Sequence, residues 1–212
     1  MGPLPVNPSR FLIRLALVSM AVLWLAKQYS DDVVGMLLPL MRAEMLALYD
    51  NVSIQSLQIS RENQTETVRL QANTVRPIYF KKFIVYPLGV RPHTSGWYQV
   101  DVNLRGALLS SVIFLIAIMS WPQQGFQELM LRMLIGLPFL AILYAVDAPL
   151  DLLGNFERVV MHSVDPDITP FLFKWGKFLE GGGTAAIAFA FAAVVISLAA
   201  RSARIDFSPR SA

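Results

Sequence analysis

The chain has 212 residues, of which 55% are hydrophobic and only 16% are charged. A soluble domain carries about a quarter of charged residues, and here the apolar residues gather in four blocks, which is typical of an integral membrane protein. The net charge of +3 comes from basic residues beside these blocks, so it indicates membrane orientation rather than a nucleic-acid partner. Cysteine is absent, which excludes disulfides, thiolate catalysis and sulfur-ligated metals.

Residues 1–50 are predicted to contain an N-terminal anchor and an amphipathic helix. The anchor spans about 11–27, and we favour a retained anchor over a cleaved signal peptide because no A-x-A-like site follows it. The motif Ser30-Asp31-Asp32 then offers a helix N-cap followed by acids. Apolar residues at helical spacing continue through 33–48. We expect this second helix to lie in the membrane interface or against the bundle.

Residues 51–105 form the one long block that is rich in charged and amide side chains, and they are predicted to fold as a small β-rich domain. Val68, Leu70 and Ala72 alternate with polar residues, and the same two-residue period runs through 97–104. Such a period places successive side chains on opposite faces, so it predicts a sheet with one wet face. The parity of the apolar residues changes near position 55, which predicts a β-bulge there.

Two further features are predicted within this block. Residues 61–64 fit a four-residue hairpin turn, and residues 80–86 are expected to form another strand. Lys81 and Lys82 charge the start of that strand, and they are candidate contacts for anionic head groups or an acidic partner. A charged strand edge that is protected from pairing explains them equally well. The last strand, at 97–104, runs into the next apolar block without a linker.

Residues 106–212 are predicted to be a three-span helical region. The spans lie at about 106–121, 129–146 and 181–200, and an outward-facing amphipathic segment occupies 147–180. The last span is rich in alanine, and Ala188 and Ala192 are candidate partner contacts because small residues let helices approach closely in lipid.

The predicted fold is therefore an α-helical integral membrane protein with four transmembrane helices. Its small extracytoplasmic β-rich domain is inserted between the first and second spans. Arginines cluster beside the span ends that both termini share, and the positive-inside rule then predicts cytoplasmic termini and a periplasmic β domain in a bacterial inner membrane. Membrane lipids and other membrane-protein subunits are the expected partners.

Acidic residues and one histidine follow the third span. Asp147 and Asp151 lie one helical turn apart, and His162, Asp165 and Asp167 come after them. One hypothesis is a carboxylate–histidine site for a metal, for proton transfer or for an aspartyl dyad. However, a zinc site usually has more nitrogen or sulfur ligands, and Asp165-Pro166-Asp167 is typical of a turn. We therefore favour interface carboxylates in water, and we expect neither a catalytic residue nor a cofactor.

Two junctions carry a family resemblance. Val102-Asn103-Leu104 leads into an apolar span, and Phe178-Leu179-Glu180 with three glycines leads into the last one. These junctions, and the order of anchor, amphipathic stretch, β segment and three spans, resemble the small membrane proteins that accompany bacterial exosortases, in particular the exosortase H-associated type. The resemblance implies a non-catalytic partner in envelope protein sorting.

Two functions are consistent with these features. The first is a non-enzymatic inner-membrane accessory, assembly or scaffold subunit that presents its β domain to a partner. The alternative is a membrane enzyme or transporter that uses Asp147, Asp151 and His162.

Overall fold

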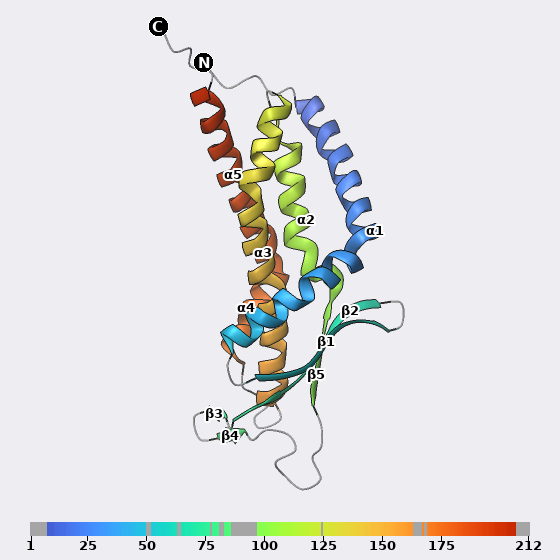
Figure 1. Cartoon of the computed structure of the whole chain (residues 1–212), viewed down its shortest axis with the longest axis vertical. Coiled ribbons are helices and arrows are strands. Elements are labelled where there is room, and N and C mark those ends of the chain that lie inside the picture. The colour runs from blue at the N-terminus through green and yellow to red at the C-terminus, as the bar shows by residue number, and fades with distance from the viewer. Residues whose placement is uncertain are drawn as a thin grey trace. The chain divides into compact units, whose positions relative to one another are not determined.

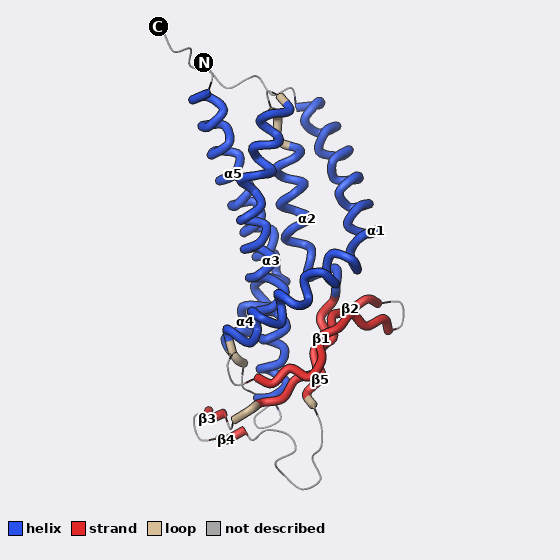
Figure 2. Tube along the Cα trace, viewed as in Figure 1, coloured by secondary structure: helices blue, strands red, loops and turns tan. Residues whose placement is uncertain are grey.

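The computed structural model describes residues 8–49, 52–62, 65–76, 78–80, 83–85, 97–123, 125–162, 167 and 169–206. This part of the chain is mostly helical, and it also contains a three-stranded sheet (Figure 1, Figure 2). The chain divides into two compact units. The helical unit comprises Met1–Tyr29, Leu109–Leu143 and Ala185–Ala212, and the sheet unit comprises Ser30–Leu108 and Tyr144–Thr184.

Parts of four helices make up the helical unit: α1 (Pro8–Leu48), α2 (Leu104–Ser120), α3 (Phe126–His162) and α5 (Thr184–Asp206). Within this unit the helices run side by side, and the start of α1, the end of α2, the start of α3 and the end of α5 lie at the same end (Figure 1). We call this the basic end, because arginines 10, 14, 132 and 201 lie near these helix ends. The core of the unit consists of Phe114, Ile118, Leu143, Ala188, Ala192 and Val195.

The loop between α2 and α3 is held by a buried arginine at the basic end. Arg132 is 1% exposed, and its guanidinium donates hydrogen bonds to the carbonyl oxygens of Trp121 at 2.9 Å and Pro122 at 2.8 Å. A longer bond of 3.4 Å reaches the Ile118 oxygen, and Glu128 forms an ion pair with Arg132 one helical turn away. Arg132 therefore satisfies carbonyl groups that the end of α2 leaves without intrahelical partners.

The sheet unit contains an antiparallel sheet with the order β1-β2-β5, formed by β1 (Val52–Glu62), β2 (Thr65–Thr74) and β5 (Tyr98–Asn103). The predicted alternation is confirmed. Leu70 lies opposite Val100 and Val68 lies opposite Val102, and all four side chains are buried. They share one core with residues 34–45 of α1 and 144–160 of α3, so these helices cover one face of the sheet while the other face carries the polar side chains.

Three local predictions can be compared with the strands. The predicted bulge is confirmed, because the pairing register shifts between Ile54 and Ser56. The predicted four-residue turn is too long, since Arg61 and Glu62 still belong to β1. The single strand predicted at 80–86 is wrong: β3 (Ile78–Phe80) and β4 (Phe83–Val85) pair with each other as a separate two-stranded sheet. The last strand does pass directly into α2, as predicted.

The predicted helix boundaries need larger corrections. A separate amphipathic helix at 33–48 is wrong as a distinct element, because α1 continues from Pro8 to Leu48 without a break. The expected N-cap at Ser30 therefore lies inside a helix. Similarly, the third apolar segment does not end at residue 146, since α3 continues to His162. Within the segment predicted to be amphipathic, α4 (Phe171–Phe178) is a separate short helix.

Among the described residues, three helical stretches are long and apolar enough to cross a membrane: Pro8–Leu48, Phe126–His162 and Phe171–Ser202. These stretches indicate a membrane protein. The helix α2 is apolar but shorter. The third stretch includes α4, a π-helical turn at Leu179–Gly183 and α5. In that turn Gly182 has φ 110°, a conformation that residues with a Cβ rarely adopt, and this explains one of the three consecutive glycines.

Candidate functional site

The first candidate site lies where α3 and α4 approach each other in the sheet unit. Asp151 is half-buried on α3, one turn after Asp147, which is 8% exposed. Asn155 donates a hydrogen bond from Nδ2 to Oδ1 of Asp151 at 3.0 Å. On α4, a Cβ at Gly176 would lie 2.8 Å from the same carboxylate oxygen. The absence of a side chain at position 176 thus allows α4 to pass directly beside the Asp151 carboxylate.

A second glycine makes the same approach possible from the α3 side. A Cβ at Gly154 would lie 2.7 Å from the carbonyl oxygen of Leu172 on α4, well inside van der Waals contact. The two helices therefore meet backbone to side chain at Gly154 and at Gly176. Neither glycine was singled out by the sequence analysis, because a lone helical glycine indicates close packing only when the opposing element is known. Asn155 was also missed, although its spacing of four residues from Asp151 is a recognisable helical pair.

Burial perturbs this carboxylate. Asp151 lies beyond the predicted apolar span 129–146, and burial raises the pKa of its carboxyl to about 6. The negative charges of Glu180 and Asp147 raise the pKa further, whereas Lys177 and the hydrogen bond from Asn155 oppose them. Lys177 itself forms an ion pair with Glu180 at 2.6 Å. Asp151 therefore exchanges a proton near neutral pH, which is a property that sites for proton transfer share.

The other residues predicted for this site are not assembled with Asp151. His162 is exposed at the end of α3, eleven residues further along, which corresponds to about 16 Å of helix rise. Asp167 is exposed, and Asp165 lies outside the described residues. Within the described part of the chain, no group of three or more His, Asp or Glu side chains is arranged to hold a metal ion. The arrangement around Asp151 can exchange a proton, but it does not resemble a metal centre.

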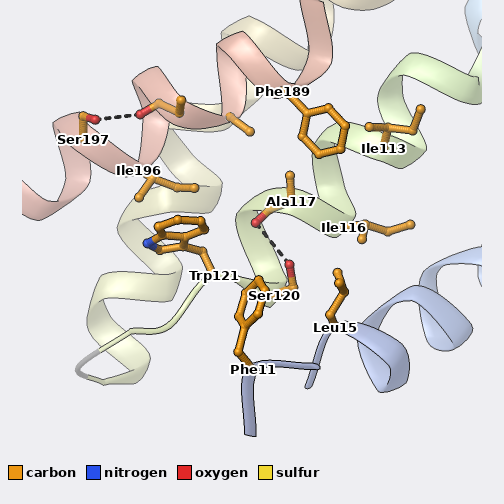
Figure 3. Close-up of a pocket in the computed structure, with 12 residues that line it drawn as sticks. Phe11, Leu15, Ile113, Ile116, Ala117, Ser120, Trp121, Phe189, Ile196 and Ser197 are labelled. Carbon is orange, nitrogen blue, oxygen red and sulfur yellow. Dashed lines mark hydrogen bonds between the residues drawn. The ribbon is translucent and has the colours of Figure 1, made fainter. Parts of the chain in front are cut away.

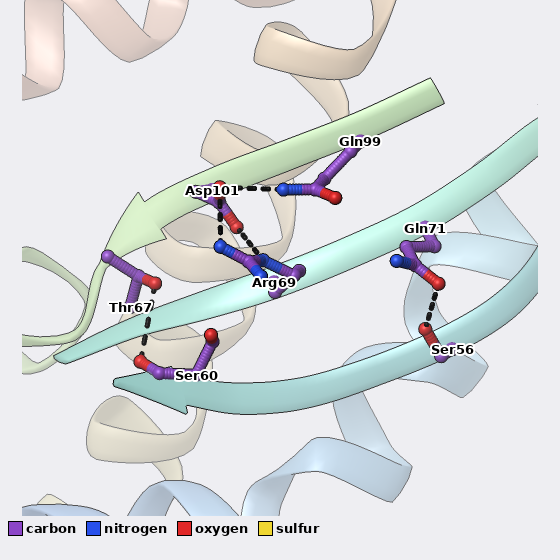
Figure 4. Close-up of polar contacts among 7 residues, drawn as sticks. All are labelled: Ser56, Ser60, Thr67, Arg69, Gln71, Gln99 and Asp101. Atoms are coloured by element: carbon purple, nitrogen blue, oxygen red, sulfur yellow. Dashed lines mark hydrogen bonds and ion pairs between the residues drawn. The ribbon is translucent and has the colours of Figure 1, made fainter. Parts of the chain in front are cut away.

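The second candidate site is the polar face of the sheet. Here Arg69 donates to Asp101 through Nε at 2.8 Å and through Nη2 at 3.3 Å, a bidentate ion pair between neighbouring strands (Figure 4). Gln99 donates to the same carboxylate at 3.2 Å, and Ser56 donates to the Gln71 side-chain oxygen at 3.0 Å. These bonds hold the side chains in defined positions across all three strands. The face is therefore a preorganised surface of charge and amide groups.

The residues predicted to contact partners have different fates. Lys81 and Lys82 lie outside the described residues. Ala188 is 0% exposed and Ala192 is 2% exposed, because both pack in the core of the helical unit. Their small side chains are used for helix packing within the chain, so these two positions offer no open surface to another protein.

No protein-family model matches the chain, and neither the curated proteins nor the solved structures contain a significant match. The resemblance to exosortase-associated proteins therefore remains a prediction, and the function has to be argued from the geometry.

Proposed function

We propose that the protein is a non-catalytic accessory, assembly or scaffold subunit of a larger membrane complex, and that it presents the polar face of its sheet to a partner. The proposed topology has four spans, with α2 as the fourth and shortest, cytoplasmic termini and a periplasmic sheet in a bacterial inner membrane. The positive-inside rule supports this orientation, since the arginines gather at the basic end. The resemblance to exosortase-associated proteins suggests envelope protein sorting as the process.

One observation supports this function above all: the two faces of the sheet are treated differently. The apolar face is consumed by the core of the sheet unit, whereas Arg69, Gln99 and Asp101 form an ordered polar array on the other face. Interfaces of transient and regulatory complexes use such charged and amide groups to select a partner, because an unmatched polar group costs free energy when it is buried. A sheet stabilised from one side is a rigid support for this kind of recognition.

Co-purification tests the proposal. The full chain is isolated from its native membrane in mild detergent, and its stable partners are identified and quantified. Gln99→Arg changes the exposed polar face without touching the core, so we expect it to reduce partner recovery about tenfold, as a misplaced interfacial charge does. Gln127→Arg makes the same substitution at an exposed position of α3 in the helical unit, and we expect it to retain the partner. Repeated isolation as a lone monomer, or equal recovery in both variants, would contradict the proposal.

The environment of Asp151 favours a second candidate function, a membrane enzyme or transporter that moves a proton. The observation in its favour is a half-buried carboxyl with a pKa of about 6 beside Gly176. Asp147→Asn and Asp151→Asn separate the two functions. A scaffold subunit keeps its partner in both variants, whereas a proton-dependent protein loses its activity while it remains folded and assembled.

A further inference from the structure

The helical unit contains a hollow of about 440 Å³ between α1, α2 and α5 (Figure 3). Its volume lies within the range of about 300–1,000 Å³ that is usual for small-molecule sites. Phe11 and Leu15 of α1, Ile113 and Ala117 of α2, and Ala193 and Ile196 of α5 line it. The wall is thus built from three helices and is almost entirely hydrocarbon.

The two hydroxyl groups in the wall are already engaged. Ser120 donates its hydroxyl hydrogen to the Ala117 carbonyl at 3.4 Å, and Ser197 donates to the Ala193 carbonyl at 2.7 Å (Figure 3). A polar ligand would therefore lose its hydrogen bonds to water without gaining replacements from these groups. The same feature disfavours a partner helix that associates through interhelical hydrogen bonds. The wall fits a flexible hydrocarbon chain.

The rim of the hollow has the opposite character. Arg14 precedes the lining residue Leu15, and its guanidinium donates to the carbonyl of Met119 at 2.8 Å. That bond uses one of five guanidinium N–H donors. Arg10, one helical turn earlier, is exposed. The half-exposed indole of Trp121 contacts the Phe11 ring edge-on, with 6.1 Å between ring centroids. Tryptophan and arginine at a helix end are typical of the membrane–water interface.

We propose that this hollow binds one acyl chain of an anionic phospholipid, whose phosphate lies at Arg14 and Arg10. The ligand must be amphiphilic, because an apolar wall and a cationic rim adjoin each other. Inside a bilayer the chain gains no hydrophobic driving force, since lipid tails are as apolar as leucine. Its binding comes from close contact with the wall, which an unfilled hollow would forfeit, and from the attraction between the phosphate and the arginines.

Native mass spectrometry of the full chain in detergent tests the apolar part. The protein is titrated with dioleoylphosphatidylglycerol, which is anionic, or with dioleoylphosphatidylcholine, which is zwitterionic. Ala193→Phe fills the hollow, so we expect the affinity for both lipids to fall about tenfold through the lost packing contacts. Ala190→Phe is the matched control: it makes the same change at an exposed alanine of α5 that does not line the hollow, and its affinity should be unchanged.

The charged part is tested in the same assay. Arg14→Gln removes the rim cation, and we expect the preference for phosphatidylglycerol over phosphatidylcholine to fall about fivefold, the effect of one basic residue near an anionic head group. Lys27→Gln removes an exposed charge beyond the other end of the predicted anchor and should leave the preference intact. Thermal unfolding of each variant verifies folding, and Ile196→Trp provides a second way to fill the hollow if Ala193→Phe does not fold.

Three results would overturn the proposal. The first is equal lipid affinity in the Ala193→Phe and Ala190→Phe proteins. The second is an unchanged lipid preference in the Arg14→Gln protein. The third comes from a photo-activatable residue in place of Ile196: adducts with another protein and none with lipid would show that a partner helix occupies the hollow. A lipid adduct at that position, lost in the presence of Ala193→Phe, supports the proposal.

Discussion

The two units of this protein arrange their apolar side chains by different rules, and α1 shows both. In its first part, which belongs to the helical unit, Leu17 is 63% exposed and Met20 is 70% exposed. In its second part, which belongs to the sheet unit, Val34, Met41 and Met45 are all 0% exposed. Lipid accepts apolar side chains that point outward, whereas a unit that faces water must bury them. One helix can therefore obey two solvents along its length.

The buried charges of the two units differ in a parallel way. Arg132 in the helical unit has backbone carbonyls and a carboxylate around its guanidinium. Asp151 in the sheet unit is half-buried, has an amide donor and lies near two other acids. A charge next to lipid has no water to turn to, so its partners must be supplied by the chain. A charge in the sheet unit can change its protonation state instead.

The largest effect is expected for removal of the arginine. Arg132→Ala leaves Glu128 buried without its cation and exposes the carbonyls at the end of α2, so we expect a loss of about 3–5 kcal/mol in the free energy of unfolding. Denaturant titration in detergent measures it. Arg132→Lys keeps the charge but cannot bond several carbonyls at once, and an intermediate loss is expected. A loss below about 1 kcal/mol for Arg132→Ala would mean that the charge is solvated.

A matched pair of leucines tests the comparison directly. Leu70→Ala in the buried face of the sheet should cost about 2–5 kcal/mol of unfolding free energy, because a cavity remains in the core. Leu17→Ala, at an exposed position of α1, should cost less than about 0.5 kcal/mol. The same titration reports both values. Equal losses would show that the first part of α1 is packed against protein rather than lipid.

The smallest effect concerns Asp151 and depends on pH. Because the folded-state pKa of about 6 lies above the ordinary value of 3.8, the folded protein binds more protons between these values, and its stability falls as pH rises through this window. Asp151→Asn removes that loss. We expect it to stabilise the protein by about 1–2 kcal/mol at pH 7, after allowance for solvent screening.

At pH 4 and below, the Asp151→Asn variant and the unchanged protein should have the same unfolding temperature, because both side chains are then neutral. Unfolding temperatures measured between pH 4 and 8 give the comparison. Glu180→Gln is the control for the neighbouring charge: it should reduce the pH dependence without removing it, since burial remains the main cause. A constant difference between variant and unchanged protein at every pH would exclude titration of Asp151 as the source.

Periodicity in the sequence determined much of the fold. The two-residue alternation around Leu70 and Val100 predicted which face of the sheet is buried, and the change of parity near position 55 predicted the bulge. Apolar blocks indicated the membrane helices. These signals are local, because a side chain's face follows from its place in its own element. For the same reason the direct join of β5 and α2 was visible in advance.

Only the tertiary structure decided where the helices end and what they enclose. The continuation of α3 beyond residue 146 depends on the sheet core that covers its second part, and no local signal reports that core. The approach of α4 to Asp151 depends on Gly154 and Gly176, which lie on different helices. The hollow lined by α1, α2 and α5 brings together residues 11 and 197. Contacts between elements follow from their packing in space, which the spacing of residues within each element does not specify.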